Sequence, residues 1–473
     1  MNTEAFDVVI IGGGSAGYAA ARTAASHGAK TAVIEGGEEI GGLCILRGCM
    51  PSKSLLESSH RWHQILEADE FGLEVRPVQP HLDQIIARKK KLIHEFASYR
   101  QDQLKTGPFA FLRGLARFTD PHTVIVKNGT EETAVTAKAF ILATGSRIAD
   151  VKIPGLAEAG YLTSDTALNL TQQPKSLIVL GGGVVAVELG QFYAHIGTKV
   201  TFIQRSPHLV KDNDEEVSAT LEAAFRDDGI TLHTGTKLLR VEHQGDTKTV
   251  VFEQGGETKQ AHAEEILYAL GRVPAVDGLG LATIDPAFAE GRVHVNESMR
   301  TAAHHIFAAG DITGLHEVVH IAIQQGEIAG YNAAMLATNT ERPDKQIDYR
   351  LKAAVTFTTP EIATVGLTCR EAAAKGINFV SASYPFNDHG KSIIMGTKHG
   401  FVKLLAETKR GEIIGASIIG PHAADLIHEI IVLMHYHGTA ADLAAIPHYH
   451  PTLAEIVTYP AEDIVDQLAS DSR

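Results

Sequence analysis

The stretch that decides the fold is Phe6-Asp-Val-Val-Ile-Ile-Gly-Gly-Gly-Ser-Ala-Gly17. Its apolar first half is typical of a strand buried on both faces of a parallel sheet. Glycines follow in the pattern Gly12-x-Gly14-x-x-Gly17, and an alanine-rich segment over 15–27 predicts a helix. Strand, glycine turn and helix in this order predict a βαβ unit that binds a dinucleotide.

Each glycine has a physical role in such a turn. Gly12 makes the tight turn, Gly14 lets the backbone approach a pyrophosphate, and Gly17 lets helix and strand pack closely. The helix N-terminus adds partial positive charge. A second apolar strand, 32–34, ends at Glu35, whose carboxylate can accept both hydroxyls of an adenosine ribose. A tight turn without a ligand is the alternative interpretation.

The same unit occurs a second time in the chain. Residues 176–180 predict a strand, Gly181-x-Gly183-x-x-Ala186 the turn, and residues 184–196 the helix. The two copies superpose at one constant offset along the sequence. Two dinucleotide sites in one chain suggest two different cofactors, one tightly held and one exchanging.

The copies differ at the position that contacts the adenosine ribose. Where the first has Glu35, the second has neutral Gln204, followed by Arg205. An acidic residue would repel a 2′-phosphate, whereas an arginine can bind it with a charge-assisted fork. We therefore expect NADPH to be preferred at the second site, with NADH as the alternative.

Composition limits the class of protein. A chain of 473 residues suggests about three domains, and 44% hydrophobic residues suffice for several cores. A net charge of −14 argues against nucleic-acid or anionic-membrane partners. No apolar run reaches the roughly 18 residues of a membrane-spanning helix, and no secretory leader is evident. Three cysteines are too few for the disulfide framework of a secreted protein. We expect a soluble, cytoplasmic, multidomain protein.

Two cysteines lie shortly after the first unit, within Gly41-Gly-Leu-Cys-Ile-Leu-Arg-Gly-Cys-Met-Pro-Ser-Lys53. Positions five apart in a regular helix are separated by about 7.5 Å, slightly beyond a disulfide span. A Cys44–Cys49 disulfide therefore needs a distorted turn, for which Gly48 and Pro51 supply the means. A strained, accessible disulfide in a cytosolic protein indicates catalysis. Zinc ligation is the alternative, but no second cysteine pair exists.

The second candidate for chemistry is His450-Pro-Thr with Glu455. A thiolate that exchanges with a disulfide needs an acid–base partner, and a carboxylate on the far imidazole nitrogen fixes its tautomer and raises its basicity. A surface histidine without catalytic role is the alternative in a chain of 24 histidines. We predict no metal site, including at the His-Tyr-His repeats 435–437 and 448–450. Cys369 is expected to be an inert thiol.

The rest of the chain gives coarser predictions. Residues 60–104 read as helical, with the basic run 88–91 on a solvated face. Strand-like runs at 353–357, 401–405 and 413–419 alternate with two helical runs. One helical run begins with the capping box Thr368-x-x-Glu371, and the other spans 424–435. This last part is predicted to be an α+β module.

Taken in order, the motifs carry a family resemblance over essentially the whole length. They are the nucleotide turn, Cys-x4-Cys-x-Pro-Ser-Lys, Ala-Thr-Gly at 143–145, the second turn, Ala-Gly-Asp at 309–311 and the terminal His-Pro-Thr-x-x-Glu. This combination resembles the pyridine nucleotide–disulfide oxidoreductases, the group of dihydrolipoamide dehydrogenase, glutathione reductase and mercuric reductase. It implies an α/β fold of two Rossmann-like dinucleotide-binding domains plus a C-terminal α+β interface domain. The implied boundaries are 1–150 (FAD-binding, first part), 151–270 (NAD(P)-binding), 271–348 (FAD/central, second part) and 349–473 (interface, dimerisation).

By the same resemblance the first unit would hold FAD, with Glu35 on its ribose and Asp311 on its ribityl–pyrophosphate side. Cys49 would face the flavin, and Cys44 would be the interchange thiol that attacks a small disulfide substrate. Further FAD positions are Gly12, Gly14, Gly17, Ala116, Thr144, Gly145 and His320, with Lys53 and Glu188 as an ion pair near flavin N5. The NAD(P) positions are Gly181, Gly183, Ala186, Glu188, Gln204, Arg205, Lys211 and Gly271, of which Lys211 matches a second basic position of glutathione reductase-like proteins.

The resemblance also implies a homodimer. His450 with Glu455 would form an acid–base dyad that reaches the active site of the other subunit. Leu46-Arg47 replaces the Asn-Val usual in dihydrolipoamide dehydrogenase, which puts a cation beside the disulfide. The paired terminal cysteines of mercuric reductase are absent, which disfavours mercuric ion as substrate. The expected function is a dihydrolipoamide dehydrogenase-like oxidoreductase; a mercuric reductase-like enzyme, a flavoprotein transhydrogenase or NAD(P)H oxidase, and a non-catalytic flavoprotein subunit are the alternatives.

Overall fold

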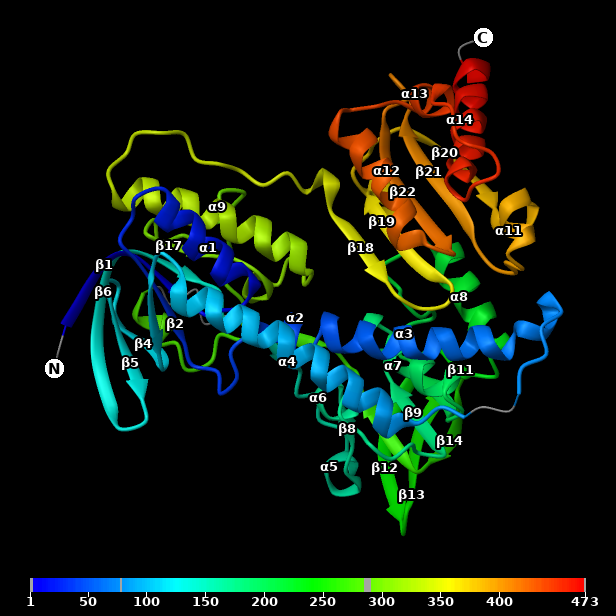
Figure 1. Cartoon of the computed structure of the whole chain (residues 1–473), viewed down its shortest axis with the longest axis horizontal. Coiled ribbons are helices and arrows are strands. Elements are labelled where there is room, and N and C mark those ends of the chain that lie inside the picture. Colours follow the sequence, from blue (N-terminus) through cyan, green and yellow to red (C-terminus); the bar gives the residue numbers. More distant parts are fainter. Residues whose placement is uncertain (1–2, 77–78, 285–290, 472–473) are drawn as a thin grey trace. The chain divides into compact units, whose positions relative to one another are not determined.

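A computed structural model describes residues 3–76, 79–284 and 291–471 of the chain (Figure 1). The chain divides into two compact units. The first comprises residues 1–51, 87–150 and 271–348, and the second comprises residues 52–86, 151–270 and 349–473. No helix in the described ranges is both long and apolar enough to pass through a membrane.

The first unit is built on a seven-stranded sheet in the order β3-β2-β1-β6-β5-β4, with β17 paired to β6. β1, β2, β3, β6 and β17 run parallel, while β4 and β5 are antiparallel additions. The predicted strand, turn and helix are confirmed as β1 and α1. The strands are β1 (Thr3–Ile11), β2 (Thr31–Glu35), β3 (Ala110–Arg113), β4 (Leu115–Asp120), β5 (Thr123–Asn128), β6 (Glu131–Leu142) and β17 (Ile306–Ala308).

Helices α1 (Ser15–Ser26) and α9 (Val319–Ala337) pack on each other and on this sheet. Their crossing is close because α9 has glycines where it meets α1. A Cβ on Gly326 would overlap the carbonyl oxygen of Ala16, and one on Gly330 that of Ala20. The short strands β7 (Ser146–Ile148) and β16 (Arg272–Pro274) pair beside them.

The second unit holds the repeated nucleotide unit. Its five-stranded sheet has the order β11-β10-β9-β15-β8, all parallel, and the predicted second strand, turn and helix are confirmed as β9 and α7. A three-stranded antiparallel sheet, β12-β13-β14, accompanies it. The elements are β8 (Leu162–Thr163), β9 (Ser176–Leu180), α7 (Val184–His195), β10 (Lys199–Ile203), α8 (Glu215–Asp227), β11 (Thr231–His233), β12 (Thr236–Gln244), β13 (Thr247–Gln254), β14 (Glu257–Ala263), β15 (Glu265–Tyr268), α5 (Leu156–Ala159) and α6 (Ser164–Ala167).

The C-terminal part of the second unit is an α+β module, as predicted. Its five-stranded sheet has the order β18-β19-β22-β21-β20, and β19 and β20 are strands that the sequence pattern missed. The predicted capping box at Thr368 and Glu371 is present. The elements are β18 (Ala353–Thr356), β19 (Glu361–Gly366), α10 (Cys369–Ala374), β20 (Phe379–Pro385), α11 (Gly390–Ile394), β21 (Phe401–Glu407), β22 (Ile413–Gly420), α12 (Ala423–His435), α13 (Ala440–Ala445) and α14 (Thr458–Asp471).

Three further helices follow the first nucleotide unit: α2 (Gly42–Leu46), α3 (Cys49–Leu66) and α4 (Leu82–Thr106). The basic run on α4 is only partly a solvated face. Arg88, Lys90 and Lys91 are exposed, but Lys89 is 4% exposed, which corrects the prediction. A run of four helical residues covers more than one full turn, so one of its members must point inward.

Candidate active site

The first glycine turn connects β1 to α1. Gly12 has a φ of +109°, and a Cβ on it would overlap the carbonyl oxygen of Ala143. A Cβ on Gly17 would overlap the carbonyl oxygen of Gly12. Gly14 caps α1 without a side-chain hydrogen bond, and the first turn of α1 has no acidic residue. The turn thus presents backbone N–H groups to an anion, as a site for the pyrophosphate of a dinucleotide requires.

The Glu35 carboxylate stands beside this turn at the end of β2. Its Oε2 accepts a hydrogen bond from the N–H of Gly13 at 2.8 Å, and its Oε1 accepts one from the N–H of Gly37 at 2.6 Å. The sequence pattern located Glu35 but not these backbone donors. They fix the carboxylate while each oxygen keeps a lone pair for a ribose hydroxyl.

The two cysteines flank a break between helices. α2 ends at Leu46 and α3 begins at Cys49, so the segment is interrupted rather than one regular helix. The sequence predicted such a distortion between the cysteines. A Cβ on Gly48 would lie 3.0 Å from the Leu43 oxygen and 3.3 Å from the Cys44 Cα, which shows how tightly the chain folds back.

A half-buried arginine near Cys44 was not found by the sequence analysis. The Arg100 guanidinium on α4 stacks over the Tyr18 ring at 4.4 Å, and its Nε and Nη1 are buried without a hydrogen-bond partner among the described groups. Burial lowers its pKa from the usual value, although Tyr18 and Cys44 oppose this shift. Arg47, the cation that the sequence placed beside the cysteines, is 49% exposed and pairs with Glu39 at 3.2 Å.

Asp311 belongs to a polar group at the edge of the same unit. Its Oδ2 accepts a hydrogen bond from Ser146 Oγ at 2.7 Å, and Arg272 donates to Ser146 Oγ at 2.9 Å and to its carbonyl oxygen at 2.8 Å. Thr144 Oγ1 donates to the Ala275 oxygen at 2.7 Å.

The structure places the other predicted FAD positions in the same unit. Ala116 is buried on β4 and His320 is exposed on α9, while Gly145 has a φ of +75°. Gly271, predicted for the NAD(P) site, belongs to this unit too, with a φ of +111°.

An ion pair joins α3 to α7 in the second unit. Lys53 Nζ lies 2.9 Å from Glu188 Oε1 and 2.8 Å from Oε2, and the Phe357 N–H donates to Oε1 at 2.9 Å. The Glu188 side chain is 3% exposed. Lys53 Nζ also lies 4.8 Å from the centre of the Phe357 ring. The structure therefore brings together the two residues that the family resemblance paired.

The second glycine turn connects β9 to α7. Gly181 has a φ of +116°, and Gly183 caps α7 without a side-chain hydrogen bond. Ala186, in the third position of the motif, is fully buried, so the turn accommodates its methyl group. No acidic residue lies in the first turn of α7. The turn again presents backbone N–H groups to an anion.

The loop after β10 carries the predicted basic residues. Gln204 Oε1 accepts a hydrogen bond from the Arg205 N–H at 3.1 Å. Arg205 and Lys211 are exposed, and neither forms an ion pair with another described residue. Both side chains are therefore available to a phosphate.

The C-terminal dyad is formed and extends further than predicted. His450 Nδ1 lies 3.0 Å from Glu455 Oε2, and the His450 side chain is 77% exposed. Behind it the fully buried His389 contacts Glu455 Oε1 through Nε2 at 3.1 Å and Ser392 Oγ through Nδ1 at 2.8 Å. Burial raises the pKa of Glu455, but the hydrogen bonds and charges of His450 and His389 outweigh it and lower the pKa.

The remaining candidates have other partners. His437 pairs with Glu412 at 2.7 Å and His448 with Glu429 at 2.8 Å, so the His-Tyr-His repeats bind separate carboxylates. Burial raises the pKa of the Cys369 thiol, so a smaller fraction of it is thiolate.

Comparison with known proteins identifies the family. The profile described as pyridine nucleotide-disulphide oxidoreductase matches residues 6–326, and that of the dimerisation domain of the same proteins matches residues 352–461. The chain belongs to the pyridine nucleotide-disulphide oxidoreductase family. The predicted fold class is thereby confirmed, and the family depends on FAD and NAD(P)H.

Relatives with assigned functions are of two kinds. The chain is 36% identical to dihydrolipoyl dehydrogenase of Bacillus subtilis, over 91% of each chain. It is 34% identical to mercuric reductase of Staphylococcus aureus, over 93% of this chain and 78% of that protein. The solved structure of LpdA from Mycobacterium tuberculosis, 28% identical, has a TM-score of 0.85 and covers 98% of this chain and 99% of that chain.

A more distant structure shares the fold. It is the Cu(II) complex of the HOCl-induced flavoprotein disulfide reductase RclA from Escherichia coli, 23% identical, with a TM-score of 0.83 over 98% of this chain and all of that chain. These findings make the protein a flavin-dependent pyridine nucleotide-disulfide oxidoreductase similar to dihydrolipoyl dehydrogenases, with a dimerisation domain.

Proposed function

We propose that this protein is dihydrolipoamide dehydrogenase-like and passes electrons between a nicotinamide nucleotide, FAD, the Cys44–Cys49 pair and a small substrate, which is reduced as a disulfide or oxidised as a dithiol. The observation that carries the proposal is the close approach of the cysteine-bearing segment to the first glycine turn. A Cβ on Gly42, two residues before Cys44, would lie 2.7 Å from the Gly14 Cα. Bound FAD would supply hydride acceptance and two-electron transfer to the cysteine pair.

The chain's own residues account for the exchange steps. The Cys44 thiolate attacks one sulfur of the substrate disulfide, so that a mixed disulfide forms and one substrate thiolate leaves. The Cys49 thiolate then attacks the Cys44 sulfur, which closes the protein disulfide and releases the second thiolate. His450 Nε2 donates protons to the leaving thiolates, while Glu455 holds the opposite nitrogen, Nδ1.

The cysteine roles are tested by single substitutions. Cys44→Ser and Cys49→Ser should both abolish disulfide reduction while FAD stays bound. Cys44→Ser alone should show a long-wavelength thiolate–flavin absorption band without reductant, because Cys49 is then the thiol that faces the flavin. Cys369→Ser is the matched control and should keep activity. The band in Cys49→Ser instead would reverse the two roles, and retained disulfide reduction in either variant would refute the proposal.

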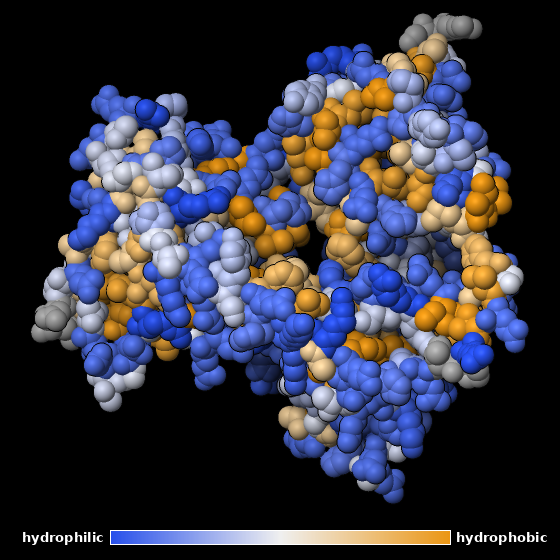
Figure 2. Space-filling view, in the orientation of Figure 1, coloured by the Kyte–Doolittle hydropathy of each residue, from blue (hydrophilic) through white to orange (hydrophobic). Residues whose placement is uncertain are grey.

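We further propose that the active site is shared between the subunits of a homodimer. His450 lies within the matched dimerisation domain, and its side chain is turned to solvent. Figure 2 shows apolar surface over α11 and α12, where Ile393, Ile394 and Val432 are each more than half exposed. Mixing Cys44→Ser chains with His450→Gln chains should restore part of the activity, because one hybrid site then has both groups. Heterodimers that form without any recovery would contradict a shared site.

NADPH is the proposed nucleotide. Two features support this proposal: position 204 holds a neutral glutamine rather than an acidic residue, and the side chain of the neighbouring Arg205 is exposed. Arg205→Ala should raise the KM for NADPH about tenfold or more and change the KM for NADH little, since a charge-assisted phosphate contact is lost. Lys199→Ala, which removes an exposed cation at the opposite end of β10, is the control. A wild-type kcat/KM that is higher for NADH would contradict the proposal.

The substrate itself is best identified by a steady-state panel of dihydrolipoamide, oxidised glutathione, related thiols and mercuric ion, each assayed with both nicotinamide nucleotides in the oxidised or reduced form that its reaction needs. We expect a lipoamide-type or other small disulfide to give the highest kcat/KM. Mercuric ion as the best substrate would contradict this expectation.

A further inference from the structure

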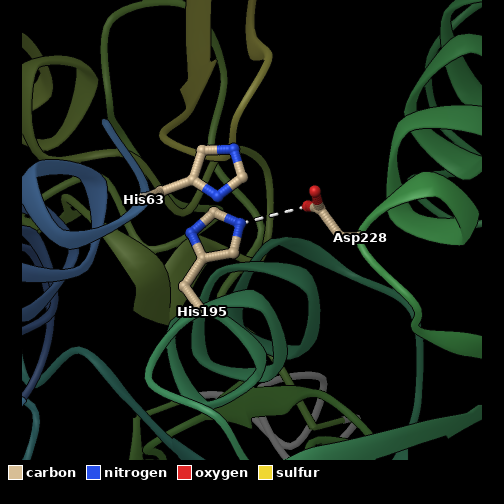
Figure 3. A group of neighbouring side chains, drawn as sticks. All are labelled: His63, His195 and Asp228. Carbon is tan, nitrogen blue, oxygen red and sulfur yellow. Dashed lines mark hydrogen bonds and ion pairs between the residues drawn. The ribbon is translucent and has the colours of Figure 1, made fainter. Parts of the chain in front are cut away.

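Three side chains converge at a place that the proposed reaction does not use (Figure 3). His63 lies on α3, His195 is the last residue of α7, and Asp228 directly follows α8. All three belong to the second unit. One donor atom from each lies within 4.8 Å of the others. The convergence therefore joins three elements that are remote from one another in sequence.

Their geometry is close to that of metal ligands. His195 Nε2 lies 3.1 Å from Asp228 Oδ2, and two ligands of a tetrahedral zinc ion lie roughly 3.4 Å apart. The His63 and His195 rings stack with centroids 4.3 Å apart and planes inclined by 9°. Figure 3 shows the Asp228 carboxylate on the same side of both rings. Because the lone pairs of stacked imidazoles lie in parallel planes, the two rings would have to tilt for one ion to reach a nitrogen of each and the Asp228 carboxylate.

Neighbouring groups hold these side chains in orientation. Glu67 Oε1 lies 3.5 Å from His63 Nε2, which leaves Nδ1 of that ring for an ion. Gln191 Nε2 donates to Asp228 Oδ2 at 3.1 Å, and Gln191 is itself fixed by two hydrogen bonds of 2.7 Å to the backbone of Thr359. His63 and Asp228 thus each have a carboxylate or an amide behind them, as ligands of protein metal sites typically do.

The arrangement differs from the other stacked histidine pair. His122 and His305 stack at 4.2 Å, but His122 Nδ1 contacts the Ala137 oxygen and His305 Nε2 the Pro121 oxygen. Backbone carbonyls thus satisfy that pair without a carboxylate. In contrast, the His195 side chain is only 3% exposed, and its Nδ1 is buried without a hydrogen-bond partner in the described chain.

We propose that His63, His195 and Asp228 bind a divalent transition-metal ion of the zinc type, with water as the fourth ligand. Two imidazole nitrogens and one carboxylate oxygen suit Zn²⁺, whereas Mg²⁺ and Ca²⁺ prefer oxygen ligands alone. The proposal departs from the sequence-based prediction of no metal site. That prediction followed local spacing, and these ligands share no local motif.

The ion would fasten the same two helices that the Lys53–Glu188 pair joins. Lys53 and His63 are about 15 Å apart along α3, and Glu188 and His195 about 10 Å apart along α7. The ion pair and the metal site therefore connect α3 and α7 at two separate levels. The expected role of the ion is to stabilise this helix pair, independent of the electron-transfer reaction.

The test measures zinc binding by the FAD-loaded protein in a Cys44→Ser, Cys49→Ser background, because two thiols would otherwise compete for the metal. Equilibrium dialysis against ZnCl₂ is compared for this parent, for His63→Gln and for Asp228→Asn. His122→Gln, which changes the other stacked pair, is the matched control. Melting temperature is recorded with Zn²⁺ and with Mg²⁺.

We expect the parent and the control to bind one zinc ion per chain. The affinity for this ion should be at least tenfold lower in His63→Gln and in Asp228→Asn. Zn²⁺, but not Mg²⁺, should raise the melting temperature of the parent and the control and not that of the variants. If His63→Gln fails to fold, Asp228→Asn decides, since it keeps the size of the side chain. Equal zinc affinity in parent and folded variants, or no zinc bound by the parent at 100-fold excess over protein, would overturn the proposal.

Discussion

Substitution of the Lys53–Glu188 pair should reveal a strongly coupled, buried charge interaction. The Glu188 carboxylate is 3% exposed and accepts hydrogen bonds from Lys53 on both oxygens and from the Phe357 N–H. Lys53→Met would leave this carboxylate buried with a backbone amide as its main donor. Glu188→Gln instead keeps an oxygen for the Phe357 N–H and removes the buried charge.

The magnitudes follow from burial. Removing one partner of a buried ion pair costs about 3–5 kcal/mol. The Lys53 side chain is 31% exposed, so water partly reaches the site and the lower end of this range applies to Lys53→Met. Glu188→Gln should cost about 1–2 kcal/mol, the scale of a changed buried hydrogen bond. The double variant should cost no more than Lys53→Met alone, which gives a coupling energy of about 1–2 kcal/mol or more.

The assay uses the single tryptophan of the chain. Trp62 lies on α3 with Lys53, so its fluorescence during urea unfolding follows that helix. Because the chain has two units, the free energies are taken from the Trp62 transition alone, at equal FAD concentration for every variant. Additive costs in the double variant, or a smaller cost for Lys53→Met than for Glu188→Gln, would refute the reasoning.

Two other buried groups give further predictions. His389→Phe should lower disulfide turnover by about tenfold, because the Glu455 carboxylate that positions His450 loses a hydrogen-bond donor. Flavin reduction by NAD(P)H, measured in stopped flow, should stay unchanged. Equal losses in both half-reactions would contradict a positioning role. Burial, with a smaller effect of Lys90, lowers the pKa of Lys89 from 10.5 to about 8. Between these values the folded chain binds fewer protons than the unfolded one, so Lys89 makes stability rise with pH there. Lys89→Met should remove that rise and raise the melting temperature at pH 7; a lower melting temperature across the whole range would contradict it.

The sequence by itself determined the features that depend on short spacings. The glycines at 12, 14 and 17 permit one kind of turn, and their repetition from Gly181 specifies a second such unit. The cysteine spacing likewise predicts a distorted turn with Gly48 and Pro51, because positions five apart in a regular helix lie slightly too far apart for a disulfide. In each case the physical constraint acts within one or two turns of chain, so the pattern of residue types is sufficient to express it.

Only the tertiary structure decided which distant groups meet. The Gly13 donor to Glu35, the stacking of Arg100 on Tyr18 and the contact of His389 with Glu455 have no local pattern of their own. The same holds for the convergence of His63, His195 and Asp228, which lie on or next to three different helices that could face in several directions by sequence alone. A side chain's partner depends on how whole elements pack, and packing is set by the summed burial of many apolar residues rather than by the few polar ones that it brings together.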